Sequence, residues 1–97
     1  MKKMFVCKRV VYNIREKRRE IIEKYPPMNE EEFFEFGKQF IKGVVFDEYN
    51  AVFIGENDLK NDIKYIKENG HEMWLLGNNP NKDIGFEEMI VELKECD

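Results

Sequence analysis

The sequence predicts a single α+β domain. Its 97 residues are the length of one domain. Short runs rich in β-branched and aromatic residues alternate with longer segments whose apolar residues recur every three or four positions, which indicates strands mixed with amphipathic helices. Apolar residues make up 42% of the chain and aromatic residues 13%, a content that excludes a disordered chain and supplies a core.

The N-terminal region predicts a strand followed by a helix. Residues 4–12 are rich in Val, Phe and Tyr, and the Lys-Arg pair inside this run suggests that the strand is bulged or lies at an edge. Asn13 is a suitable N-cap for a helix over 14–25. A proline pair follows and would end that helix, because the residue before proline is disfavoured in helical geometry.

A second helix is predicted over 30–42. Asn29 precedes it as a cap, and three glutamates fill its first turn, where the helix dipole favours negative charge. Its apolar residues have helical spacing: Phe33, Phe36, Phe40 and Ile41. Gly43 follows, in the position where helices commonly end.

Two short strands, 44–46 and 51–54, form a predicted hairpin around a polar turn. A third helix is expected over 58–68 with Asn57 as its cap, and an Asn-Gly pair stops it. The apolar run 72–76 then predicts a buried strand.

The last element is predicted to be a helix over 84–95 capped by Asp83. The resulting order, β-α-α-β-β-α-β-α, contains the ferredoxin-like unit with one helix inserted and one appended. That unit is a four-stranded antiparallel sheet with helices packed mainly on one face. The alternative is a looser α+β arrangement whose first strand is unpaired or helical.

The segment Val-Val-Tyr-Asn-Ile over 10–14, followed by Arg18 and Arg19, resembles the start of the small ferredoxin-like nuclease of the CRISPR adaptation complex. That family carries a metal-binding Asp at the end of its first strand. The matching position here is Asn13, so the resemblance does not carry over the metal ligand. It covers about ten residues.

No catalytic, metal-binding or cofactor-binding motif is predicted. The chain has no Ser or Thr, which excludes hydroxyl nucleophiles of those types. His71 is the sole histidine and has no neighbouring ligands to complete a zinc site. No signal peptide or membrane span is recognised, so a cytoplasmic protein with Cys7 and Cys96 reduced is expected.

Charge is distributed unevenly along the chain. Residues 1–25 hold nine Lys and Arg against three Asp and Glu, whereas residues 26–97 hold seven against seventeen. Such asymmetry concerns partners rather than fold. Its plainest interpretation is that the two regions neutralise one another on a solvated surface.

Two functional interpretations compete with that one. An acidic surface could bind a basic protein partner, using Glu30, Glu31, Glu32, Glu35, Asp47, Glu48 and Tyr49. Alternatively, a basic first helix could bind nucleic-acid phosphates through Arg15, Lys17, Arg18 and Arg19.

The small size, the acidity and an amino-acid composition typical of proteins encoded by AT-rich genomes lead to one expectation. The chain is a non-enzymatic phage or mobile-element accessory protein that inhibits a host nucleic-acid-handling complex, such as a CRISPR-type defence system, through its acidic surface. The nucleic-acid-binding module is the second hypothesis. A small metal-dependent nuclease is the third hypothesis and ranks last, because the sequence has no cluster of metal ligands.

Overall fold

The computed structural model describes residues 2–40, 55–77 and 83–96. It contains four strands, two α-helices and a short 3-10 helix: β1 (Lys2–Asn13), β2 (Arg18–Lys24), α1 (Glu30–Gly37), η1 (Lys38–Phe40), α2 (Glu56–Asn69), β3 (His71–Gly77) and β4 (Ile84–Cys96). The α+β class is therefore confirmed.

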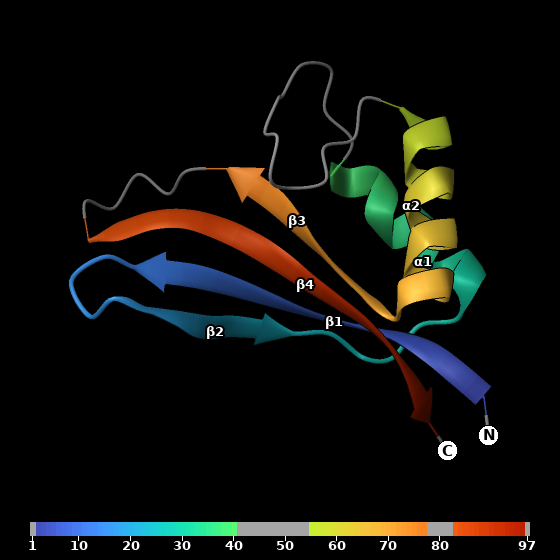
Figure 1. The fold of residues 1–97 in the computed structure, drawn as a ribbon, viewed down its shortest axis with the longest axis horizontal. Coiled ribbons are helices and arrows are strands. Elements are labelled where there is room, and N and C mark those ends of the chain that lie inside the picture. The colour runs from blue at the N-terminus through green and yellow to red at the C-terminus, as the bar shows by residue number, and fades with distance from the viewer. Residues whose placement is uncertain (1, 41–54, 78–82, 97) are drawn as a thin grey trace.

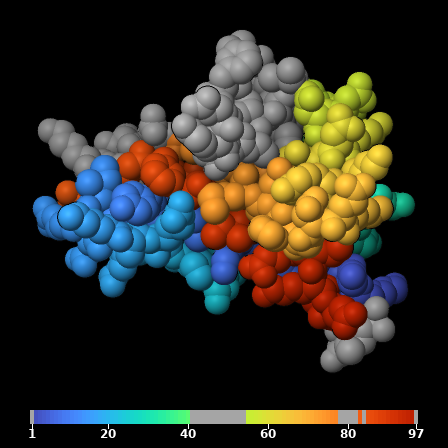
Figure 2. Space-filling model, viewed as in Figure 1, coloured from blue at the N-terminus to red at the C-terminus, as the bar shows by residue number. Residues whose placement is uncertain are grey.

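The strands form one four-stranded antiparallel sheet with the order β2-β1-β4-β3. Its centre is the long pair β1 and β4, in register from Lys2 opposite Cys96 to Val11 opposite Glu87. The sheet extends well beyond the helices, and the β1–β2 turn forms the far end of the molecule (Figure 1). The same view with all atoms drawn places the β1–β2 hairpin at one end and α2 at the other (Figure 2).

Helices α1 and α2 cover one face of the sheet, at the end where β1 begins and β4 finishes (Figure 1). The core lies under them and consists of Phe5, Cys7, Phe33, Leu59, Ile63, Ile66, Trp74, Met89 and Val91. Phe33 from α1 is fully buried, with ring centroids 4.4 Å from Phe5 and 5.4 Å from Trp74. One helix residue thus packs against strands on both sides of β4.

The prediction of a helix over 14–25 is wrong, because this segment is a hairpin turn followed by β2. The Asn13 side chain accepts a hydrogen bond from the Glu16 N–H at 2.9 Å, as an N-cap would, but here the bond closes a turn. Lys17 adopts a left-handed φ of 55°, which reverses the chain. The apolar residues are too few for a buried helix stripe, and Ile21 and Ile22 stay about half-exposed.

The prediction of a helix over 84–95 is also wrong, because this segment is β4. Its apolar residues fit a period of two as well as a helical period. Met89 and Val91 point to the helix-covered face, and the residue between them, Ile90, lies opposite Lys8 on the other face. Asp83 does not cap a helix; its carbonyl accepts a hydrogen bond from the Ile14 N–H at 2.8 Å.

The ferredoxin-like order is not confirmed. In that unit, helices connect the strands of each split βαβ pair, whereas here β1 runs directly into β2 and both helices lie between β2 and β3. The predicted hairpin strands, 44–46 and 51–54, lie outside the described residues, as do Ile41 and Gly43.

The helix predicted over 30–42 begins at Glu30 as expected, but α1 ends at Gly37 and the 3-10 helix η1 covers Lys38–Phe40. The predictions of two strands hold. The strand over 4–12 lies within β1 as a bulged central strand, with the irregularity between Arg9 and Val10. The strand over 72–76 lies within β3, and Trp74 is 1% exposed.

The third predicted helix is α2, which begins slightly earlier than expected. Its N-cap is Gly55, without a side-chain bond, so the prediction that Asn57 caps it is wrong. Gly70 ends the helix at φ 88°, as the Asn-Gly pair predicted.

The two helices approach each other closely at Gly37. A Cβ atom at this position would lie 2.8 Å from Cδ1 of Leu59, closer than side chains pack. The absence of a side chain at this residue therefore lets the backbone of α1 approach Leu59 of α2.

Asn29→Ala is expected to lower the free energy of unfolding by about 1 kcal/mol, because Asn29 is the N-cap of α1. Its side chain accepts from the Glu32 N–H at 2.8 Å, and its own N–H donates to the Glu32 carboxylate at 3.0 Å. Urea denaturation followed by circular dichroism measures the change. Asn61→Ala, an exposed substitution within α2, is the control; equal losses in both variants would contradict the capping role.

Candidate functional site

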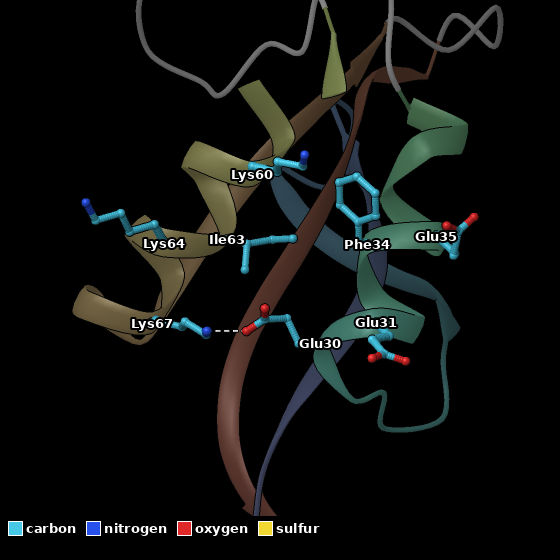
Figure 3. A pocket seen from close by; sticks show the side chains of 8 residues that line it. All are labelled: Glu30, Glu31, Phe34, Glu35, Lys60, Ile63, Lys64 and Lys67. Carbon is cyan, nitrogen blue, oxygen red and sulfur yellow. Dashed lines mark ion pairs between the residues drawn. The ribbon is translucent and has the colours of Figure 1, made fainter. Parts of the chain in front are cut away.

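A surface groove of about 620 Å³ runs between α1 and α2. Four residues from each helix line it: Glu30, Glu31, Phe34 and Glu35 from α1, and Lys60, Ile63, Lys64 and Lys67 from α2 (Figure 3). We call this the α1–α2 groove. Both walls are regular helices whose facing apolar residues pack into one core, so the groove is a fixed feature of the fold.

The floor of the groove is apolar. Phe34 and Ile63 project toward each other between the helices (Figure 3). Ile63 is only 6% exposed, whereas Phe34 is partly exposed and offers its ring to the groove. The ammonium groups of Lys38 and Lys60 lie 4.9 and 5.9 Å from the Phe34 ring centroid, within cation–π range. The ring therefore combines apolar surface with affinity for cations.

The two sides of the groove carry opposite charges. The α1 side is a glutamate edge, consisting of Glu30, Glu31 and Glu35, and the α2 side is a lysine edge, consisting of Lys60, Lys64 and Lys67. Glu30 and Lys67 form an ion pair across one end of the groove. Glu31, Glu35 and Lys64 point outward on the two opposite rims (Figure 3).

The structure brings together part of the predicted acidic surface. Glu31 is exposed, and within the described ranges it makes no ion pair. Glu35 lies 3.1 Å from the Lys38 ammonium. Glu32 instead belongs to the cap of α1. The other three predicted residues, Asp47, Glu48 and Tyr49, lie outside the described residues.

Sequence reasoning missed the lysine edge, although a signal for it was present. Lys60, Lys64 and Lys67 recur at helical spacing in a segment that was correctly predicted to be a helix. The sequence did not show that this side of α2 lies next to the glutamates of α1.

The predicted basic residues lie on the β1–β2 hairpin and not on a helix. All four are exposed: Arg15, Lys17, Arg18 and Arg19. Three of them contact carboxylates. Arg15 lies 3.6 Å from Asp83, Arg18 lies 3.3 Å from Glu20, and the Arg19 Nε donates to Glu88 at 2.9 Å.

Carboxylates at or next to the start of β4 neutralise much of the positive charge of the hairpin. Asp83, directly before β4, contacts Arg15, Glu88 of β4 contacts Arg19, and Glu87 of β4 forms an ion pair with Arg9 of β1. Phosphate binding needs a surface on which cations outnumber anions. The hairpin places its arginines beside acidic residues from β2 and β4, so it does not form such a surface.

Glu88 and Arg19 form a structural cluster on the face of the sheet that the helices leave uncovered. Glu88 is 3% exposed. The Arg19 guanidinium lies 5.9 Å from the Tyr12 ring centroid and 6.0 Å from that of Phe86, and these two rings stack 5.2 Å apart. Arg19 thus covers a buried carboxylate and two aromatic rings, a packing role that leaves it poorly placed to contact phosphate.

Two carboxyl groups meet at the junction of α2 and β3. One oxygen each of Asp62 and Glu72 is buried. Burial raises the pKa of Glu72 to about 8, and the hydrogen bond and negative charge of Asp62 add to this increase. Burial also raises the pKa of Asp62, although hydrogen bonds from Glu72 and Trp74 oppose the rise. We infer that the pair shares a proton near neutral pH.

Other candidate chemistry is sparse in the described part of the chain. Cys7 and Cys96 are free thiols, and burial raises the pKa of Cys7 to about 12, so it is a poor nucleophile. His71 is exposed on β3. Residues 2–40, 55–77 and 83–96 contain no group of three or more metal-ligating side chains, and none of the helices formed there is long and apolar enough to cross a membrane.

The α1–α2 groove is therefore the feature of the described surface that best fits a binding site. Comparisons with protein-family models, with curated proteins and with solved structures found no match to this chain.

Proposed function

We propose that this chain is a non-enzymatic binding protein and that it docks a protein partner in the α1–α2 groove. The observation that carries the proposal is the combination of an apolar floor, in which Phe34 is partly exposed and Ile63 is buried, with two oppositely charged edges. An apolar centre surrounded by polar residues is the usual arrangement of a protein interface. Charged edges then determine orientation and partner choice.

A macromolecular partner fits this groove better than a small ligand. The groove is an open furrow along two helices, and its rims are long, flexible Lys and Glu side chains. Small-molecule sites are usually enclosed and hold a few fixed polar groups. The charged side chains around Phe34 are instead arranged in rows along the two helices, and this arrangement fits contact with a protein surface.

The glutamate edge favours a partner with basic residues. Glu31 and Glu35 are exposed on the rim of α1, so lysine or arginine side chains of a partner can reach them from solvent. We therefore keep the proposal that the partner is a basic protein and that the chain inhibits a nucleic-acid-handling complex. Its support is the charge of this edge and the sequence composition.

Affinity capture with variants of the groove tests the proposal. Phe34→Ala removes the floor ring, and Tyr65→Ala removes an exposed ring of α2 that does not line the groove. We expect a partner captured by the unmodified protein to bind Phe34→Ala at least about tenfold more weakly, as for interface anchors, and to bind Tyr65→Ala normally. Thermal unfolding verifies that both variants are folded. A partner that binds all three proteins equally would contradict the proposal.

A further inference from the structure

We propose that the α1–α2 groove binds the same groove of a second copy of this chain, forming a symmetric dimer. This inference rests on the proposed role of the groove as a protein-docking site, and it makes a second copy a competitor of the basic partner for that site. It follows from the charge pattern: glutamates lie on the α1 side, lysines lie on the α2 side, and Phe34 and Ile63 lie between them.

Such a pattern is complementary to itself under a two-fold axis that runs parallel to the groove. Rotation about this axis turns one surface over onto the other and exchanges its two sides. The glutamate edge of each copy then faces the lysine edge of the other, and the two apolar floors meet at the centre. Symmetric dimers use the same patch on both subunits, so self-complementarity is the property that such an interface requires.

The charged residues of the two edges also lie at matching positions along the axis of the groove, which we call their heights. Helices α1 and α2 run in opposite directions, because Glu30 at the start of α1 pairs with Lys67 near the end of α2. One turn further along α1, Phe34 lies beside Lys60. Because the rotation keeps every residue at its own height, the proposed dimer places Glu31 and Glu35 of one copy on the side that faces Lys64 of the other.

Two of the facing rim side chains, Glu31 and Lys64, are available for this contact, whereas Glu35 already contacts Lys38. In the described part of the molecule neither Glu31 nor Lys64 forms an ion pair, and both are exposed. Lysine side chains can lay their methylene stems on apolar surface while keeping the ammonium group at a carboxylate. The stems of the lysine edge can therefore fill the space over Phe34 and Ile63 of the facing copy.

Charge reversal tests the dimer. We expect the unmodified protein to dimerise reversibly in sedimentation equilibrium, and Glu31→Lys or Lys64→Glu to weaken dimerisation at least about tenfold, since each places like charges opposite one another. Glu68→Lys and Lys24→Glu are matched controls, because both residues are exposed and neither lines the groove. We expect both controls to dimerise normally.

Two combinations of these variants make the test specific. An equimolar mixture of Glu31→Lys and Lys64→Glu is expected to form heterodimers, because the reversed edge of each variant faces an opposite charge on the other. The double variant, which carries both substitutions in one chain, is expected to regain self-association for the same reason. A general loss of folding or solubility would not be rescued by mixing.

Three outcomes would overturn the dimer. The first is an unmodified protein that stays monomeric up to about 1 mM, the range of very weak association. The second is a dimer that both single reversals leave unchanged, and the third is a mixture that forms no heterodimer. If the protein is monomeric but captures a different protein in a Phe34-dependent manner, the dimer is wrong and the proposed docking role stands. If neither form of binding depends on the groove, both proposals fail.

Discussion

Trp74→Ala is expected to lower the free energy of unfolding by about 3–5 kcal/mol. The side chain is 1% exposed and lies between the sheet and the helices, with its ring centroid 5.4 Å from Phe33 and 6.0 Å from Phe40. Its removal leaves a large cavity where β3, α1 and η1 meet. For a domain of this size the total stability is roughly 5–15 kcal/mol, so the variant is expected to be marginally folded.

Chemical denaturation followed by circular dichroism measures this loss. Tyr65→Ala serves as the control, because Tyr65 is about half-exposed and its removal is expected to change stability by about 0.5 kcal/mol or less. Trp74 is the one tryptophan, so its fluorescence reports on its own surroundings. An emission maximum in the native protein like that of free tryptophan in water would contradict the burial of β3.

Glu72→Gln is expected to remove a pH dependence of stability. The pKa of Glu72 is raised from 4.5 to about 8 in the folded protein, so between these values the folded state holds a proton that the unfolded state has released. This contribution is fully present below pH 4.5 and is lost as the pH rises to about 8. Above that pH, two carboxylates face each other at the α2–β3 junction.

Glutamine stays neutral and can still donate to Asp62, so we expect Glu72→Gln to be more stable than the unmodified protein at pH 9. After allowance for water at this partly buried site, the difference is about 1–2 kcal/mol. At pH 4.5 the two proteins should be similar. Thermal unfolding across this range measures the effect, and Glu68→Gln, an exposed change in α2, is the control. Parallel pH profiles for all three proteins would show that the pair does not share a proton.

The sequence predicted most reliably the elements whose signals are local. The Asn29 cap, the acidic first turn and the Gly70 stop are each set by neighbouring backbone groups, and α1 begins and α2 ends at these signals. The two segments predicted as helices that are strands, 14–25 and 84–95, have ambiguous spacing. Residues 84–95 fit a helix and a strand equally well, and pairing with β1, far away in the sequence, favours the strand.

The sequence predicted the glutamate edge of the candidate site but not its lysine edge, for a related reason. Glu30, Glu31 and Glu35 are a visible run, but the lysines that face them come from another helix. The basic run at 15–19 likewise predicted a positive surface, but the fold places Asp83, directly before β4, and Glu88 of β4 beside it. Charge along a chain describes each segment alone, whereas binding depends on what the fold places next to it.

The central ladder of the sheet has a consequence for folding kinetics. The β1–β4 ladder joins residues near opposite ends of the sequence, and the most distant pair is Lys2 and Cys96. The β1–β2 hairpin needs only a short turn, but closing β1 onto β4 carries the entropy cost of a loop that includes both helices. Proteins dominated by such distant contacts fold slowly. On a ribosome, β1 therefore has to wait for the end of β4, and in that interval its apolar residues, such as Phe5 and Val10, are exposed to other chains.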